Sequence, residues 1–220
     1  MGHPHTPTMS LLDKLIGTRH GVAAAPPHAR SRAERQAAVD GSDSALLAAR
    51  LLRAPTALMQ LGEAEALAVV GFMQPRWFEA GTTLIRQGDS ADTGFMVLVL
   101  EGEVTVETLV ASRTQPRTLT VLGPGSLIGE MALVDGGARS ASCVASTDLK
   151  CAVLTREALE ALITEQPATA AKLMTAVAQR LAGRLREGDH KLQVYGKLVQ
   201  AMQQEIDALM PTPDLRKQQP

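Results

Sequence analysis

The chain of 220 residues has no long apolar run, few aromatic residues and no excess of charge of either sign. Its longest uninterrupted run of large apolar residues is 95–100, whereas a membrane-spanning helix needs about 20. Lys and Arg total 22 against 23 Asp and Glu, so the basic excess typical of a nucleic-acid-binding domain is missing. Aromatic residues make up only 2%, too few for a surface that stacks single-stranded bases. The composition therefore argues against a membrane protein and against a DNA-binding or RNA-binding one.

Cysteine is also scarce, because only Cys143 and Cys151 occur. Two cysteines are too few for a disulfide scaffold at this length, so we expect both thiols to be buried and reduced. Their spacing also allows them to lie on neighbouring strands of one hairpin, which leaves a cross-strand disulfide as the alternative. The first residues lack the basic and apolar regions of a secretory signal, so we expect a cytoplasmic protein.

Residues 1–41 contain prolines, four of the five histidines and a stretch rich in Arg and Ala with little periodicity, which predicts a mostly mobile segment. Within it, the leucines and isoleucine of 9–16 share one helical face. This short helix either docks on its own domain or binds a partner.

Residues 42–165 read as a domain of helices and short strands. The cluster Ser42-Asp-Ser44 predicts the start of a helix over 45–53, and a second helix is expected over 62–73. From 76 to 154, short segments rich in Val, Leu and Thr recur between glycine turns, which predicts an antiparallel β barrel or sandwich. A further helix is expected over 156–165.

Residues 166–211 predict a long helix that starts at Pro167, followed by a polar tail at 212–220. Apolar residues alternate by four and three, which is typical of a coiled-coil seam. The seam positions are Met174, Ala178, Leu181, Leu185, Gly188, Leu192, Tyr195, Val199, Met202, Ile206 and Leu209. Glu187-Gly-Asp189 leaves open whether this is one helix or two. The seam either folds back on the barrel or, as we expect, forms a homodimer through residues 174–209.

Most of the candidate ligand-binding residues lie in the segment 125–145. A strand is expected to end at Gly129, a one-turn helix to follow over 130–134, and Arg139 to open the next strand. The N-terminus of a helix favours an anion, and a guanidinium can grip two oxygens of a phosphate. Glu130 can accept a hydrogen bond from a sugar hydroxyl, as acidic residues do for ribose. Alternatively, Glu130 and Arg139 form a surface salt bridge of little worth.

This segment contains the motifs Gly-Glu-Met-Ala-Leu at 129–133 and Arg-Ser-Ala at 139–141. Their sequence and spacing resemble the phosphate-binding cassette of the cyclic-nucleotide-binding domain superfamily, in particular the bacterial catabolite-activator type. The resemblance extends to Ala80-Gly-Thr-Thr-Leu-Ile-Arg-Gln-Gly-Asp89 and Gly102-Glu-Val104, and covers about residues 60–185. It implies a mostly β fold, a double-stranded β-helix or jelly-roll barrel with flanking helices and a long C-terminal dimerisation helix.

The resemblance also implies a ligand set. Glu130 would bind the ribose 2′-hydroxyl and Arg139 the cyclic phosphate, and serine at 140 favours cyclic AMP, with cyclic GMP as the alternative. The full set is Gly129, Glu130, Met131, Ala132, Arg139, Ser140, Ala141 and Arg184. Neither catalytic residues nor metal ligands are expected, because neither a nucleophile–base set nor a metal-binding constellation accompanies the cassette.

Three departures from the family pattern stand out. The segment Asp92–Gly102 is two residues longer than usual, and an even insertion preserves the alternation of a strand. Arg184 and Leu185 stand where the activator offers a Thr-Ser pair to the base, so Arg184 either contacts the base or flanks the coiled coil. No helix-turn-helix pattern follows residue 175.

The sequence thus predicts a cytoplasmic regulatory sensor that binds a cyclic nucleotide, acts as a homodimer and signals to an effector protein of unknown identity. The alternatives are a transcription regulator of the activator type without its DNA-binding head, and a coiled-coil scaffold that no longer binds nucleotide.

Overall fold

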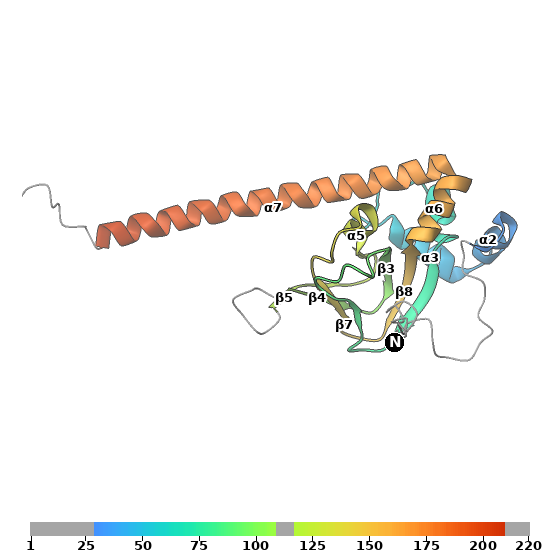
Figure 1. Cartoon of the computed structure of the whole chain (residues 1–220), viewed down its shortest axis with the longest axis horizontal. Coiled ribbons are helices and arrows are strands. Elements are labelled where there is room, and N and C mark those ends of the chain that lie inside the picture. Colours follow the sequence, from blue (N-terminus) through green and yellow to red (C-terminus); the bar gives the residue numbers. More distant parts are fainter. Residues whose placement is uncertain (1–28, 109–116, 210–220) are drawn as a thin grey trace, which may run out of the picture. The chain divides into compact units, whose positions relative to one another are not determined.

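The structure, a computed structural model, describes residues 29–108 and 117–209, and the chain divides into two units between Ala178 and Gln179. The first unit holds two β-sheets and the helices around them, and the second holds the remainder of the long C-terminal helix (Figure 1). The first unit therefore continues past residue 165, where the sequence placed a domain boundary. The helix predicted over 9–16 lies outside the described residues.

The first described helix, α2 (Arg32–Val39), was not predicted. Ser31 accepts a hydrogen bond from the Glu34 backbone N–H, and the Glu34 carboxylate accepts one from the Ser31 N–H, so a capping box starts this helix. The expectation of a mobile segment is therefore wrong for residues 32–39, because capping and tertiary contacts order a stretch whose apolar pattern is weak.

Two further helices follow as expected. α3 (Asp43–Leu52) is capped by the Ser42 hydroxyl, which accepts from the Ala45 N–H at 3.3 Å. α4 (Glu63–Val70) ends before the predicted residue 73, and Gly71 is its C-cap.

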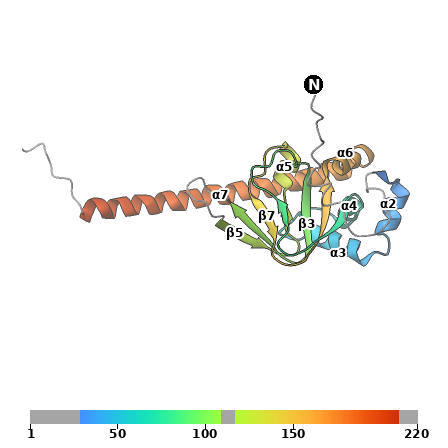
Figure 2. The same cartoon turned by 60° about the horizontal axis from the view of Figure 1, so that its bottom comes forward.

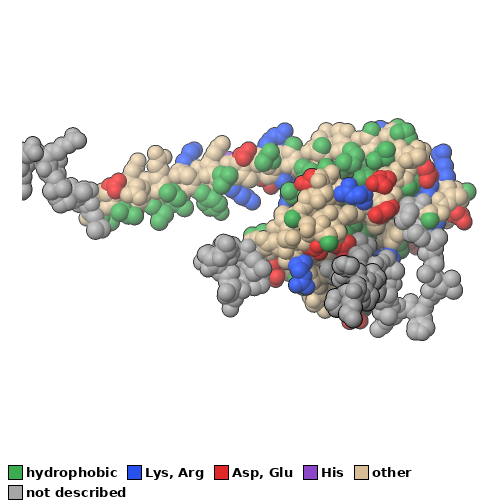
Figure 3. Space-filling model, viewed as in Figure 1, with side chains coloured by type: hydrophobic (Ala, Val, Ile, Leu, Met, Phe, Trp, Pro, Cys, Tyr) green, Lys and Arg blue, Asp and Glu red, His purple; other side chains and the backbone are tan. Residues whose placement is uncertain are grey.

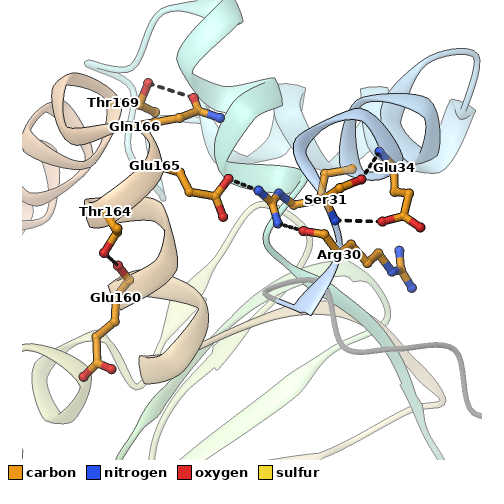
Figure 4. A network of polar contacts seen from close by, with 9 residues as sticks. Arg30, Ser31, Glu34, Glu160, Thr164, Glu165, Gln166 and Thr169 are labelled. Atoms are coloured by element: carbon orange, nitrogen blue, oxygen red, sulfur yellow. Dashed lines mark hydrogen bonds and ion pairs between the residues drawn. The ribbon is translucent and has the colours of Figure 1, made fainter.

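Figure 4 shows how α2 is held to α6 (Arg156–Glu165). The guanidinium of Arg35 pairs with the Glu165 carboxylate and donates to the carbonyl of Arg30. It also lies 4.2 Å from the centre of the Phe72 ring, and Arg35 is buried. A buried arginine therefore joins two elements that lie far apart in the sequence.

Eight strands form two four-stranded sheets in which every neighbouring pair is antiparallel. The order is β1-β8-β3-β6 in one sheet and β2-β7-β4-β5 in the other. The strands are β1 (Gln74–Phe78), β2 (Thr83–Ile85), β3 (Phe95–Glu101), β4 (Val104–Thr108), β5 (Arg117–Leu122), β6 (Leu127–Ile128), β7 (Ser142–Ala145) and β8 (Leu149–Thr155). This is the jelly-roll fold that the sequence predicted, and α2, α3 and α6 gather at one end of it (Figures 1 and 2).

The barrel core is built from inward-facing side chains of both sheets. Its buried members are Phe78, Leu84, Ile85, Phe95, Val97, Val99, Val104, Ile128, Cys143, Ala145, Leu149, Cys151 and Val153. β3 is buried on both faces over residues 95–99, because α3 and α5 pack against the side that points away from the core. Such a strand reads as a continuous apolar run, which explains why 95–100 is the longest in the sequence.

The two cysteines are free and buried, as expected, but they do not share a hairpin. Cys143 on β7 pairs with β2 and β4, whereas Cys151 on β8 pairs with β1 and β3. The alternative of neighbouring strands in one hairpin is wrong, because the chain crosses from one sheet to the other between β7 and β8.

The alternation that the sequence predicted for the segment Asp92–Gly102 is interrupted near the end of β3. Against β8, Val99 pairs with Cys151 but Glu101 pairs with Lys150, so Leu100 is an extra residue in a bulge. The shift turns Glu101 toward solvent, where its carboxylate lies 2.7 Å from the Lys150 ammonium.

α6 and α7 (Pro167–Leu209) have the predicted starts, and α7 is one uninterrupted helix through Gly188. Its first turns bury Ala170, Leu173, Ala176 and Val177 in the first unit. Although α7 has 43 residues, no helix within the described parts of the chain is apolar enough over a sufficient length to cross a membrane.

Candidate functional site

The predicted cassette begins where β6 ends. Gly129 has φ 80° and ψ 6°, a left-handed conformation that non-glycine residues rarely adopt, and α5 (Glu130–Asp135) starts directly after it. A Cβ at Gly129 would lie 2.8 Å from Nη1 of Arg139 and 3.1 Å from the carbonyl oxygen of Phe95. Glycine at this position therefore permits both the turn into α5 and the close approach of the arginine.

Arg139 is the centre of the site and is 4% exposed. Its Nε and Nη2 donate to the carbonyl of Asp92 at 3.2 and 2.9 Å. Nη1 and Nη2 both donate to the carbonyl of Phe95 at 3.1 Å, and Nη1 also donates to the carbonyl of Gly129 at 3.0 Å. The guanidinium thus ties together three backbone segments, from the start of β3, the end of β6 and the start of β7.

Burial and neighbouring charges act on Arg139 in opposite directions. Burial lowers the pKa of its guanidinium, whereas the negative charges of Asp92, Asp89 and Glu130 raise it. The guanidinium also lies 4.3 Å from the centre of the Phe95 ring. An arginine placed in this way offers a desolvated positive charge, which attracts an anion more strongly than an exposed one does.

Glu130 is 1% exposed and is the first residue of α5. Because Glu130 and Arg139 are both buried, the alternative of a surface salt bridge between them is wrong. A carboxylate at this position lies where a helix favours negative charge.

The turn after β2 is attached to the same site. The Gly88 N–H donates to the carbonyl of Arg139 at 2.8 Å, and the Arg139 N–H donates to the carbonyl of Asp89 at 2.9 Å. The Asp89 carboxylate accepts from the N–H groups of Ala91 and Asp92. The recess beside Arg139 is lined by Thr83, Leu84, Ile85, Arg86, Asp89, Asp92, Phe95 and Arg139.

Most of these lining residues were missed as site residues. The motif 80–89 and the segment from Asp92 were noticed for their family resemblance, but nothing in the sequence showed that the carbonyls of Asp92 and Phe95 would accept from Arg139. Backbone acceptors leave no signature in side-chain identity, and only the pairing of the strands brings them together.

The remaining predicted residues occupy different environments. Met131 is 42% exposed and Ser140 is exposed, whereas Ala132 is buried and Ala141 is half-buried. The carbonyl of Ala132 accepts from Nη2 of Arg156 at 3.2 Å, so it fastens α5 to the start of α6. Arg184 lies on α7 in the second unit, and its contact with a nucleotide base stays a prediction.

Within residues 29–108 and 117–209, no group of three or more His, Cys, Asp or Glu side chains is arranged to hold a metal ion. Burial raises the pKa of the Cys143 thiol to about 11, although Arg139 acts against this shift. A thiol with so high a pKa is a poor nucleophile at neutral pH.

The family model for the cyclic nucleotide-binding domain matches residues 75–166, which include β1, the cassette and α6. These residues are therefore a cyclic-nucleotide-binding domain. This family is regulatory and not catalytic.

Known proteins similar to this cyclic-nucleotide-binding domain include the cyclic AMP receptor protein of Thermus thermophilus, which is 41% identical over 124 residues. That alignment covers 56% of this chain and 54% of the relative, so the chain spans about half the length of that protein.

Two crystal structures share the fold. A cyclic nucleotide-binding domain from Methylobacillus flagellatus is 29% identical, with a TM-score of 0.57, and the match covers 68% of this chain and 82% of that one. The Thermus thermophilus catabolite activator protein is 38% identical, with a TM-score of 0.53, over 62% of this chain and 61% of that one.

Proposed function

We propose that the chain is a non-catalytic regulatory module that binds cyclic AMP and acts as a homodimer on an effector protein. The observation that carries the proposal is Arg139, which is buried, belongs to the cassette and lines a recess. A cyclic nucleotide carries one negative charge on its phosphate, and one desolvated guanidinium matches that charge.

Binding requires a rearrangement, because Arg139 makes five hydrogen bonds to backbone carbonyls. A guanidinium has five N–H donors in a fixed plane. The phosphate oxygens therefore replace some of the carbonyls of Asp92, Phe95 and Gly129, and the segments that these carbonyls belong to are released. Such a release favours a second arrangement of the domain, which is the basis of a population shift.

Cyclic AMP is preferred to cyclic GMP for two reasons. Serine rather than threonine follows Arg139, and the relative from Thermus thermophilus bears the name of a cyclic AMP receptor. Cyclic GMP remains the alternative ligand.

The homodimer is proposed from the exposed seam of α7. Figure 3 shows hydrophobic side chains along α7 beyond the first unit. Its large members between 49% and 75% exposed are Leu185, Leu192, Val194, Tyr195, Leu198, Val199, Met202, Ile206 and Leu209. Most of them follow the four-and-three spacing, which a second copy of the same helix can cover.

Isothermal titration calorimetry of the full chain with cyclic AMP, cyclic GMP and cyclic di-GMP tests the proposal. We expect binding of cyclic AMP, weaker binding of cyclic GMP and none of cyclic di-GMP. Arg139→Lys keeps the charge but loses the planar donors, so it should weaken binding at least about tenfold. The exposed Arg50→Gln on α3 is the control and should bind as the wild type does.

One observation favours a second candidate, a scaffold that binds no nucleotide. The donors of Arg139 are already satisfied by the chain's own backbone, so the arginine also has a structural role. A folded wild-type chain that gives no heat with any of the three nucleotides would support this candidate and overturn the proposal.

A further inference from the structure

Arg86 lies at the recess but is not among the predicted site residues. It follows β2 directly, its side chain is exposed, and it lines the recess together with Arg139 and Asp89. Its carbonyl accepts from the Asp89 N–H at 3.2 Å, which closes the turn that is attached to Arg139. Within the part of the chain that the structure describes, the Arg86 guanidinium makes no hydrogen bond or ion pair.

The charges around Arg139 explain why a second cation matters there. The carboxylates of Asp92, Asp89 and Glu130 all act on this one guanidinium. The Asp89 carboxylate faces the N–H groups of Ala91 and Asp92, which offset only part of its charge. Without Arg86, an approaching phosphate meets three carboxylates and only one guanidinium, so Arg86 supplies the second positive charge at the recess.

Arg86 and Arg139 also differ in how readily an anion from solution can reach them. Arg139 is buried and its N–H groups are directed at backbone carbonyls, so an anion in solution cannot reach them without a rearrangement. Arg86 is exposed at the rim and can meet the anion immediately. Exposed charges of this kind accelerate association, and their effect falls as salt increases.

We infer that Arg86 is a second phosphate-binding residue, which captures the anionic phosphate at the rim before Arg139 receives it. This inference rests on the proposed function, because it takes the ligand to be a cyclic nucleotide. Since the action is by charge at the rim, it appears mainly in the association rate, whereas Arg139 determines the dissociation rate.

Stopped-flow binding of a fluorescent cyclic AMP analogue to the full chain, at several salt concentrations, tests the inference. Arg86→Gln should lower the association rate constant about three- to tenfold at low salt and flatten its salt dependence, with less than about a twofold change in dissociation. Arg86→Lys should retain most of the wild-type association rate, because it keeps the charge. Arg50→Gln removes one exposed positive charge outside the recess and should leave both rates unchanged.

Three results overturn the inference while leaving cyclic nucleotide binding in place. These are an association rate for Arg86→Gln equal to that of Arg50→Gln, an equal loss in Arg86→Lys and Arg86→Gln, and a loss confined to the dissociation rate. A wild-type chain that is folded but binds no analogue overturns the proposed function together with this inference. Thermal unfolding of the variants should match the wild type, since Arg86 is exposed.

Discussion

At the scale of single residues, the site depends on how Arg139 and Gly129 fit together. The carbonyl of Gly129 accepts from Arg139, and the space that a Cβ would fill at residue 129 is occupied by the same guanidinium. Glycine is therefore required at residue 129 for two reasons, the left-handed backbone conformation and the close approach of Arg139.

Gly129→Ala should lower the free energy of unfolding by about 1–3 kcal/mol, because alanine is strained at a φ of 80°. It should also weaken cyclic nucleotide binding, since the new methyl group displaces Arg139. Urea unfolding followed by circular dichroism measures the first effect and calorimetry the second. Gly123→Ala is the matched control, because a Cβ there meets no atom within 4 Å. Equal stability of the two variants would contradict the prediction.

The buried thiols give a prediction about pH. Burial raises the pKa of Cys143 to about 11 and that of Cys151 to about 12, from an ordinary value of 9.0. Because the folded state disfavours the thiolate, ionisation of the thiols favours the unfolded state. The free energy of unfolding is therefore unaffected by these thiols below pH 9 and falls as the pH rises from 9 toward 11 and 12.

The folded chain should accordingly react very slowly with a thiol-specific disulfide reagent at pH 8, and urea should expose both thiols. Rapid reaction of either cysteine in the folded chain at pH 8 would show that the thiol is accessible and would contradict the structure.

At the scale of elements, α2 and α6 are joined by the buried side chain of Arg35. The guanidinium satisfies the Glu165 carboxylate and the Arg30 carbonyl and stacks on Phe72. Arg156 of α6 also donates to the Ala132 carbonyl of the cassette helix α5, so α2 and the cassette both contact α6.

Arg35→Gln should destabilise the domain by about 2 kcal/mol, because a charged hydrogen bond to Glu165 is lost. It should also speed hydrogen exchange of the α2 amides over 32–39. Arg32→Gln removes an exposed charge from the same helix and should change neither quantity. If α2 exchanges equally in both variants, the ion pair does not hold this helix.

The sequence predicted the elements that local signals specify. Thr155 caps α6 and Pro167 opens α7, so both starts could be read from the order of residues. The Ser31–Glu34 capping box was a local signal for α2 that the prediction missed. The burial of Arg35 could not be read from the sequence, because it depends on Phe72 and Glu165, which lie far along the chain. The strands were predicted, but their assignment to two sheets was not, as the separation of Cys143 from Cys151 shows.

At the scale of the whole molecule, the cyclic-nucleotide-binding domain is continuous with a helix that carries an exposed apolar seam. α7 begins inside the first unit, where Leu173 and Val177 are buried, and runs without a break into the second. The buried first turns of α7 and its exposed seam therefore belong to one helix.

The homodimer prediction can be tested on the seam. The wild-type chain should sediment at about twice its 23.3 kDa mass. Leu192→Asp combined with Val199→Asp puts charge into the seam and should give a monomer. Gln193→Asp combined with Gln200→Asp adds the same charge to exposed positions outside the seam and should stay dimeric. A wild-type chain that remains monomeric at all concentrations would contradict the proposed dimer.

The five hydrogen bonds of Arg139 have a consequence for how the affinity of the proposed site evolves. The free energy of binding includes the cost of freeing the arginine from its own backbone, so affinity depends on the resting state as much as on the bound one. Substitutions outside the recess that loosen the segment Asp92–Phe95 can strengthen the proposed binding without a contact to the ligand. The affinity of the proposed site can thus be adjusted by substitutions that leave its specificity unchanged.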